Sequence, residues 1–176
     1  MNTDIYTTKS IEAIREASFL AEQYYHSLIE NEHLLHALIT QEDGIVPSII
    51  ERITERTHVS SSTLKSDVEN LLDNKPRSIG DTARTSLSTY VEDTAKRAEK
   101  WAKQLQDEYV STEHFLLALA EDGGKISDVL KAHGINTKTI LEALRESRGN
   151  ARVTSETPES TFNALDKYCL DLTSQA

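Results

Sequence analysis

The chain has 176 residues, of which 38% are hydrophobic and 27% charged, with only 6 glycines and 3 prolines. This composition is typical of a folded, helix-rich protein and excludes a disordered or fibrous one. With 29 acidic against 19 basic residues the net charge is −10, which argues against a general binder of nucleic-acid phosphates, because such binding needs clustered Lys and Arg.

Apolar residues recur at helical spacing along most of the chain, and no segment alternates in the manner of a β-strand. Four helices are expected in the first half, over Thr8–Tyr25, Asn31–Thr40, Pro47–Arg56 and Ser62–Asp73. Four more are expected in the second half, over Thr82–Gln106, Thr112–Glu121, Ser127–His133 and Thr137–Ser147. The predicted fold class is all-α.

The sequence also repeats itself. Residues 29–38 (Ile-Glu-Asn-Glu-His-Leu-Leu-His-Ala-Leu) match residues 110–119 (Val-Ser-Thr-Glu-His-Phe-Leu-Leu-Ala-Leu), an offset of 110 − 29 = 81 positions. Each copy reads as a long helix, a short apolar helix, a glycine turn and two further helices. We therefore expect two tandem four-helix repeats, about 1–74 and about 82–148, packed as one eight-helix bundle with pseudo-two-fold symmetry.

The character of the chain changes after this bundle. Residues 149–160 are polar and contain Gly and Pro, which predicts a flexible linker. Residues 161–176 resume an apolar pattern, so a new element is expected to begin there and the natural polypeptide to continue. Cys169 is the sole cysteine, which excludes an intrachain disulfide. No export signal is visible and the longest apolar run, Phe115–Ala120, is too short to span a membrane, so we expect a cytoplasmic protein without membrane contact.

The duplicated Glu-His-(Leu/Phe)-Leu-x-Ala-Leu helix, the glycine turn after it and residues 129–134 resemble the Clp repeat at the N-terminus of Clp-type AAA+ unfoldases. Residues 164–173 are similar to the segment that enters the first ATPase module of ClpB-type disaggregases. The resemblance implies a domain that engages unfolded or aggregated polypeptide for threading by a hexameric ring, in concert with a DnaK-type chaperone system. The fragment itself is expected to be monomeric.

Nucleotide chemistry is expected to reside elsewhere in such a protein. The only Gly-Lys pair, Gly124-Lys125, has Leu119 where a phosphate-binding loop needs its first glycine and Ile126 where it needs Ser or Thr. We therefore expect no catalysis and no cofactor in this chain, with ATP and magnesium bound by AAA+ modules beyond its end.

The resemblance also implies a set of substrate-binding residues. Thr7, Asp107 and Glu113 correspond to polar positions that line the groove with which such domains contact unfolded chains. Trp101 and Tyr109 are candidates for its apolar wall, whereas Val110 and Phe115 are better explained as core. We expect the three polar residues to form one accessible rim, where alanine weakens substrate binding with little loss of melting temperature.

Two other functions compete with this one. The same fold could dock adaptor proteins in a ClpC-like protease unfoldase. A remote alternative is a small zinc hydrolase that uses His33 and His36, which lie on adjacent helical positions. The second repeat has Leu117 in place of His36, and His33 recurs as His114 at a helix start, where a polar side chain can bond free backbone N–H groups. A structural role for the histidines is therefore favoured, and no metal is expected.

Overall fold

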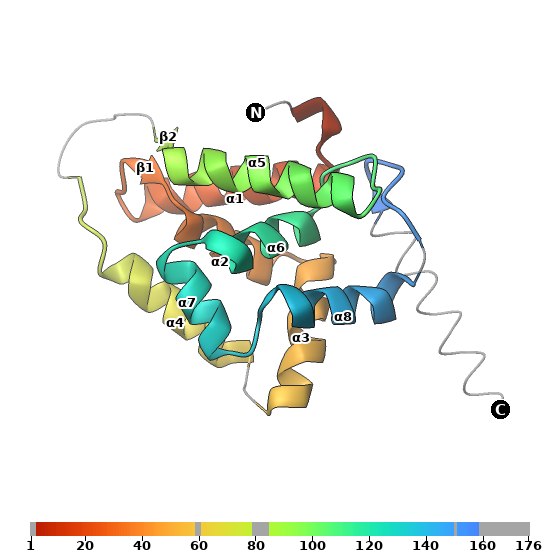
Figure 1. Cartoon of the computed structure of the whole chain (residues 1–176). Helices are drawn as coiled ribbons and strands as arrows, with labels where there is room; N and C mark the ends of the chain where they lie inside the picture. Colours follow the sequence, from red (N-terminus) through yellow and green to blue (C-terminus); the bar gives the residue numbers. More distant parts are fainter. Residues whose placement is uncertain (1–2, 59–60, 79–84, 150, 159–176) are drawn as a thin grey trace.

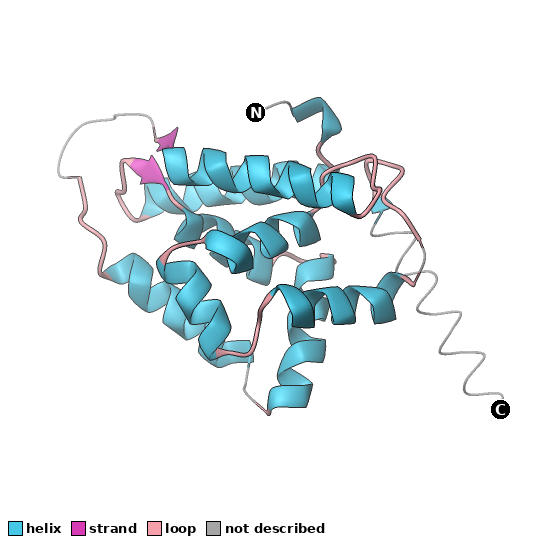
Figure 2. Ribbon diagram, in the orientation of Figure 1, coloured by secondary structure: helices cyan, strands magenta, loops and turns pink. Residues whose placement is uncertain are grey.

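The computed structural model describes residues 3–58, 61–78, 85–149 and 151–158 (Figure 1). A short 3₁₀ helix at Thr3–Ile5 precedes the first repeat, which contains α1 (Thr8–Gln23), α2 (Asn31–Thr40), α3 (Ile45–Thr57) and α4 (Ser61–Asp73). The second repeat contains α5 (Thr89–Gln104), α6 (Thr112–Asp122), α7 (Lys125–Ala132) and α8 (Thr137–Arg148). The predicted all-α, eight-helix fold is confirmed for the described part of the chain. A pair of two-residue strands, β1 (Leu28–Ile29) and β2 (Ser86–Leu87), is added to it (Figure 2).

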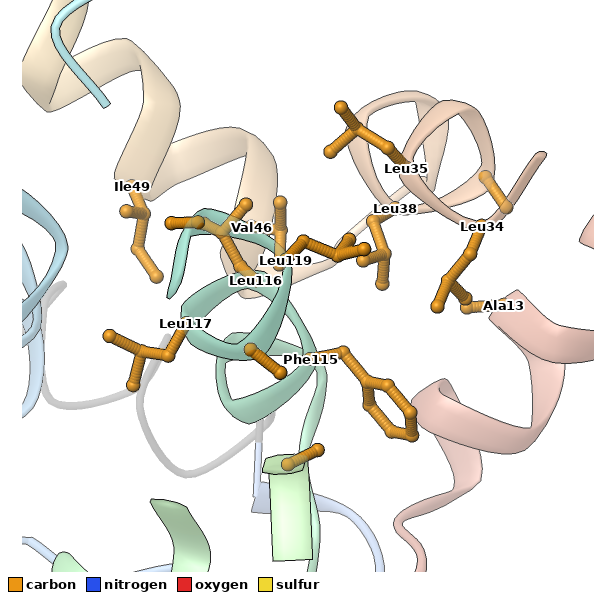
Figure 3. Close-up of a cluster of buried hydrophobic side chains, with 14 of the residues drawn as sticks. Ala13, Leu34, Leu35, Leu38, Val46, Ile49, Phe115, Leu116, Leu117 and Leu119 are labelled. Carbon is orange, nitrogen blue, oxygen red and sulfur yellow. The ribbon is translucent and has the colours of Figure 1, made fainter. Parts of the chain in front are cut away.

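The two short apolar helices, α2 and α6, form the centre of the bundle. The long helices α1 and α5 run across the top of the view in Figure 1, while α3, α4, α7 and α8 lie below the two central helices. In α6 every residue from Thr112 to Ala120 is buried, because a helix that is apolar on all sides must be covered on all sides. Figure 3 shows its leucines packed among side chains of α1, α2 and α3, so the two repeats share one core.

Equivalent positions of the two repeats adopt the same local structure at the offset of 81. Thr7 and Ser88 cap α1 and α5, each accepting a backbone N–H, from Ser10 and Val91 respectively, at 3.2 Å. The parallel β1–β2 pair has its counterpart in a parallel bridge between Tyr6 and Val110. The predicted pseudo-two-fold relation therefore extends to the caps and to the extended segments beside them.

The start of α5 differs from the prediction. Apolar spacing placed it at Thr82, but the helix begins at Thr89, because Ser88 caps it and Leu87 belongs to β2. Residues 79–84 lie outside the described residues. The end of α1 also comes earlier than predicted, because Tyr25 takes a left-handed conformation with φ of 57° that stops the helix.

Residues 151–158 lie within the stretch for which the sequence predicts a flexible linker, yet they pack against the domain. Val153 is fully buried and joins the hydrophobic core, and backbone hydrogen bonds tie the segment to the loop after α5 and to the start of α1. The predicted new element at 161–176 lies outside the described residues. In the described ranges, no helix combines the length and the apolar character needed to cross a membrane.

Candidate functional site

A buried carboxylate, Asp107, organises the loop between α5 and α6. Gln106 takes a left-handed conformation with φ of 60°, which ends α5 and lets the Asp107 N–H donate to the carbonyl of Ala102 at 2.8 Å. This turn directs the Asp107 side chain inward, where it is only 9% exposed. The local sequence thus places a charged group against the start of α6.

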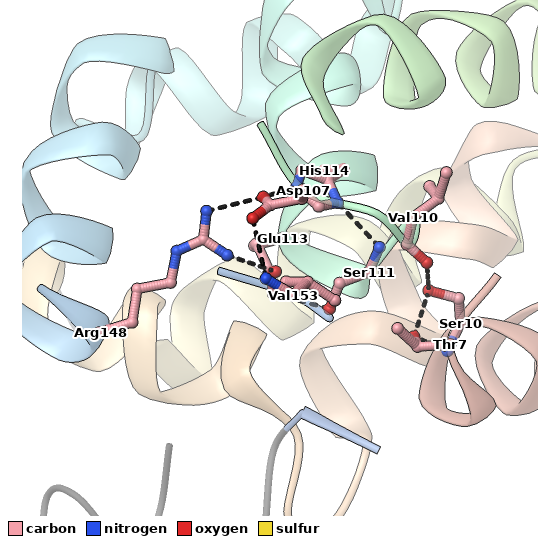
Figure 4. A network of polar contacts seen from close by, with 9 residues as sticks. All are labelled: Thr7, Ser10, Asp107, Val110, Ser111, Glu113, His114, Arg148 and Val153. Atoms are coloured by element: carbon pink, nitrogen blue, oxygen red, sulfur yellow. Dashed lines mark hydrogen bonds and ion pairs between the residues drawn. The ribbon is translucent and has the colours of Figure 1, made fainter. Parts of the chain in front are cut away.

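Three donors surround the Asp107 carboxylate (Figure 4). Oδ2 accepts from Nε2 of His114 at 2.7 Å and from Nη2 of Arg148 at 2.8 Å, while Oδ1 accepts from the backbone N–H of Val153 at 2.9 Å. The Ser111 N–H donates to Nδ1 of His114 at 2.8 Å, so the ring proton lies on Nε2 and points at Asp107. Every contact therefore favours the ionised carboxylate.

Arg148, the last residue of α8, joins two carboxylates. Besides Asp107 it contacts Glu113, with 3.4 Å between Nη1 and Oε1, and Glu113 also accepts from the Ser111 hydroxyl at 2.9 Å. Burial by itself raises the pKa of Asp107, but the hydrogen bonds from His114, Val153 and Arg148 outweigh it and hold that pKa below its usual range. The site therefore joins one cation, two anions and an imidazole.

Thr7 adjoins this network through Val110. Its hydroxyl caps α1 and donates to the Ser10 hydroxyl at 3.0 Å, and Ser10 in turn donates to the Val110 carbonyl at 3.0 Å. The Thr7 N–H donates to the same carbonyl at 3.0 Å. Hydrogen bonds therefore join the segment before α1 to the segment before α6.

The three polar residues predicted as a rim are thus brought into one region, but they do not form an accessible rim. Thr7 and Glu113 are 0% exposed and Asp107 is 9% exposed. The physical reason is that each satisfies a buried partner, namely a helix N-terminus for Thr7 and Arg148 for the two carboxylates. Alanine at Asp107 or Glu113 would leave Arg148 short of a partner, so the expectation of unchanged melting temperature is corrected to a loss of stability.

The two residues predicted to form the apolar wall lie in different places. Tyr109 is half-buried beside the network, and its backbone N–H donates to the Val153 carbonyl at 3.3 Å. Trp101 is half-buried on α5, but its indole donates to Glu121 near the far end of α6 at 2.9 Å, away from the network. Val110 and Phe115 are core, as expected, with Phe115 packed edge-to-face on Tyr6 at 5.6 Å between ring centroids.

Two residues of the site were missed by the sequence reasoning. Arg148 gives no local signal, because its partners lie 41 and 35 positions earlier in the chain. Val153 does give one, since it is the sole branched aliphatic residue in the polar stretch 149–160. An isolated apolar residue in a polar stretch is a candidate anchor that docks the stretch on the domain.

The first repeat holds a different set of groups at the equivalent place. His26 stands where the second repeat has Asp107, and its Nδ1 lies 2.8 Å from Nε2 of His33. His33 accepts the Glu30 N–H at 2.8 Å, so it is a helix-start residue like His114 and the predicted structural role is confirmed. His36 instead contacts Glu69 at 3.4 Å. Among the described residues, no cluster of three or more His, Cys, Asp or Glu is suited to hold a metal ion.

Comparison with known proteins adds an independent line of evidence. Residues 5–133 match the family described as the Clp repeat (R) N-terminal domain. The chain is 38% identical over 178 aligned residues to "Chaperone protein ClpB" of Bacillus anthracis and 37% identical over 170 to that of Mycobacterium tuberculosis, covering 99% and 97% of this chain. It spans only 20% of the length of these relatives.

A solved structure has the same fold. The Hsp104 N-terminal domain from Candida albicans superposes with a TM-score of 0.72 at 26% identity, over 88% of this chain and 98% of that one. The similarity in fold therefore extends over nearly the whole of that N-terminal domain.

Proposed function

Because the chain belongs to the Clp repeat (R) N-terminal domain family, we propose that it is the substrate-binding domain of a ClpB-like, ATP-dependent protein disaggregase. In this function it engages unfolded or aggregated polypeptide and passes it to a hexameric AAA+ ring, where ATP and magnesium are bound. Its own contribution is reversible binding and not catalysis. The parent protein would cooperate with a DnaK-type chaperone system in the cytoplasm, whereas the fragment alone is a monomer.

The observation that carries this proposal is a set of groups that can hold a polypeptide by its backbone. The N–H groups of Thr8, Glu108 and Tyr109 and the carboxylate of Asp107 all bond backbone atoms of one segment, residues 151–158. We call these four residues the binding edge. Backbone hydrogen bonds are available from any sequence, so such an edge suits a domain that must accept many different clients.

The test is an NMR titration of the ¹⁵N-labelled chain with a chemically unfolded, non-aggregating protein. We expect the amide signals of Thr8, Glu108 and Tyr109 to shift, because their N–H groups change partners. The positions 81 residues away, Thr89, Ser27 and Leu28, provide an internal comparison within the same spectra. Binding is expected to be weak, because a disordered client loses conformational entropy when it is ordered.

Three results are distinguishable. Shifts at the binding edge support client recognition there. Shifts of the same size confined to other residues would keep the function but move its site. No shifts at saturating client, together with a stoichiometric complex with an adaptor protein, would replace the proposal by the adaptor-docking function of a ClpC-like unfoldase.

A further inference from the structure

The 151–158 segment is held on the domain by the four residues of the binding edge. The Val153 N–H donates to Asp107 Oδ1 at 2.9 Å, and its carbonyl accepts from the N–H groups of Glu108 at 2.8 Å and Tyr109 at 3.3 Å. Further along, the Glu156 carbonyl accepts the Thr8 N–H at 2.8 Å. All four groups of the binding edge are therefore occupied by the chain itself.

Val153 supplies the main side-chain contribution to this docking. It is 0% exposed and belongs to the hydrophobic core, whereas residues 154–157 are exposed. Ala151 packs against the core and Pro158 is buried at the end of the segment. An unrelated polypeptide with a valine or isoleucine can reproduce the backbone hydrogen bonds and the burial of the β-branched side chain.

The first repeat lacks the acceptor that this docking uses. At the position equivalent to Asp107 stands His26, whose Nδ1 is taken up by His33. The Asp107 carboxylate, in contrast, has one oxygen, Oδ1, that accepts the Val153 N–H at 2.9 Å. That oxygen is a feature of the second repeat and is matched to a backbone donor.

We propose that residues 151–158 are an intramolecular pseudosubstrate, which closes the binding edge until a client displaces it. The client class follows from the same contacts, namely segments that carry one β-branched aliphatic residue whose N–H reaches Asp107. This inference rests on the proposed function, because it concerns the same edge. It adds that the apparent affinity for clients is set by competition with the chain's own segment.

The experiment uses the full 176-residue chain and measures client affinity by fluorescence anisotropy of a labelled unfolded protein. Val153→Ser removes the buried side chain and keeps the backbone. Since burying a valine is worth a factor of roughly ten or more in docking, we expect the apparent client affinity of the variant to rise about tenfold. Thr154→Ala, at the exposed neighbouring position, is the matched control and should leave affinity unchanged.

A peptide of residues 151–158 supplies a second readout. Added in excess, it should compete with the client for the Val153→Ser chain, and the same peptide with Ser in place of Val should compete about tenfold less well. Hydrogen exchange gives a third, because client bound to the wild-type chain should deprotect the Val153 amide. If Val153→Ser lowers the melting temperature too far for binding to be measured, Val153→Ala and the wild-type exchange experiment carry the test.

Failure of the pseudosubstrate and failure of the proposed function give different results. If client binds the wild type and Val153→Ser equally well, the peptide does not compete and the Val153 amide stays protected, the pseudosubstrate is refuted while client binding stands. If client binds neither chain although both are folded, the proposed function itself has failed.

Discussion

Stability in mild acid should depend on a histidine pair in the first repeat. His33 is 0% exposed, and because it accepts the Glu30 N–H at Nδ1, its proton lies on Nε2 and is donated to Nδ1 of His26 at 2.8 Å. Burial, together with the nearby His26 and Lys75, lowers the pKa of His33 to about 3. Protonated His33 would have to keep facing the ring of His26, whose own pKa is lowered by burial, Lys75 and Arg77, with Glu32 opposing.

The sign and size of the stability loss in acid follow from the linkage between proton binding and folding. The unfolded chain binds this proton with a pKa of about 6.5 and the folded chain does so only near 3, so stability is full above neutral pH and is lost as pH falls below about 6.5. For His33 alone the loss between about pH 7 and pH 5 is roughly 2 kcal/mol. His26 adds a loss of the same sign.

The assay is urea denaturation at about pH 7 and pH 5 with fixed ionic strength, because the usual pKa of a histidine lies between them. His33→Gln is the matched variant, since its amide can accept the Glu30 N–H and donate to His26 but does not titrate in this range. We expect the wild type to lose about 2 kcal/mol more than His33→Gln on acidification. An equal loss in the two proteins would refute the assignment of a neutral, buried His33.

Other positions give further expectations for the free energy of unfolding, each measured by chemical denaturation. Arg148→Met should destabilise by about 3–5 kcal/mol, because it leaves two buried carboxylates without their cation, and a change below 1 kcal/mol would contradict the network. Gly134→Ala should cost about 1–3 kcal/mol, since φ is +74° and the new Cβ would lie 2.8 Å from Cγ2 of Thr57; Thr57→Ser should restore only part of it, and full stability in Gly134→Ala alone would refute the strain. Leu116→Ala should cost about 2–5 kcal/mol at the centre of the shared core, whereas a loss confined to one repeat's hydrogen-exchange pattern would argue against a single cooperative unit.

Local rules in the sequence predicted most of the helices. The bounds of α2, Asn31–Thr40, follow from a polar start, a histidine that reaches back to the turn before it and a run of apolar residues. The start of α5 was mistaken because Leu87 continues the apolar spacing of the helix, and only its strand contact shows that it belongs to a different element. Apolar periodicity indicates which residues are buried, but it does not show whether such a residue belongs to the helix or to the element before it.

The candidate site was predictable in part for a related reason. Asp107 and Glu113 lie close together in the sequence, so their proximity in space follows from one turn. Their burial does not, because it depends on Arg148 and Val153, which return to them from the end of the last helix. Contacts across several helices are set by packing, which a local pattern does not encode.

The hydrogen bond between Thr8 and Glu156 has a further consequence. It joins the start of α1 to the last described segment of the chain. A covalent cross-link between these two points would close the polypeptide between them into a loop and would stabilise the domain by removing conformations from the unfolded chain. The same cross-link would hold residues 151–158 in place, so the cross-linked domain should be both more resistant to denaturant and unable to accept a client.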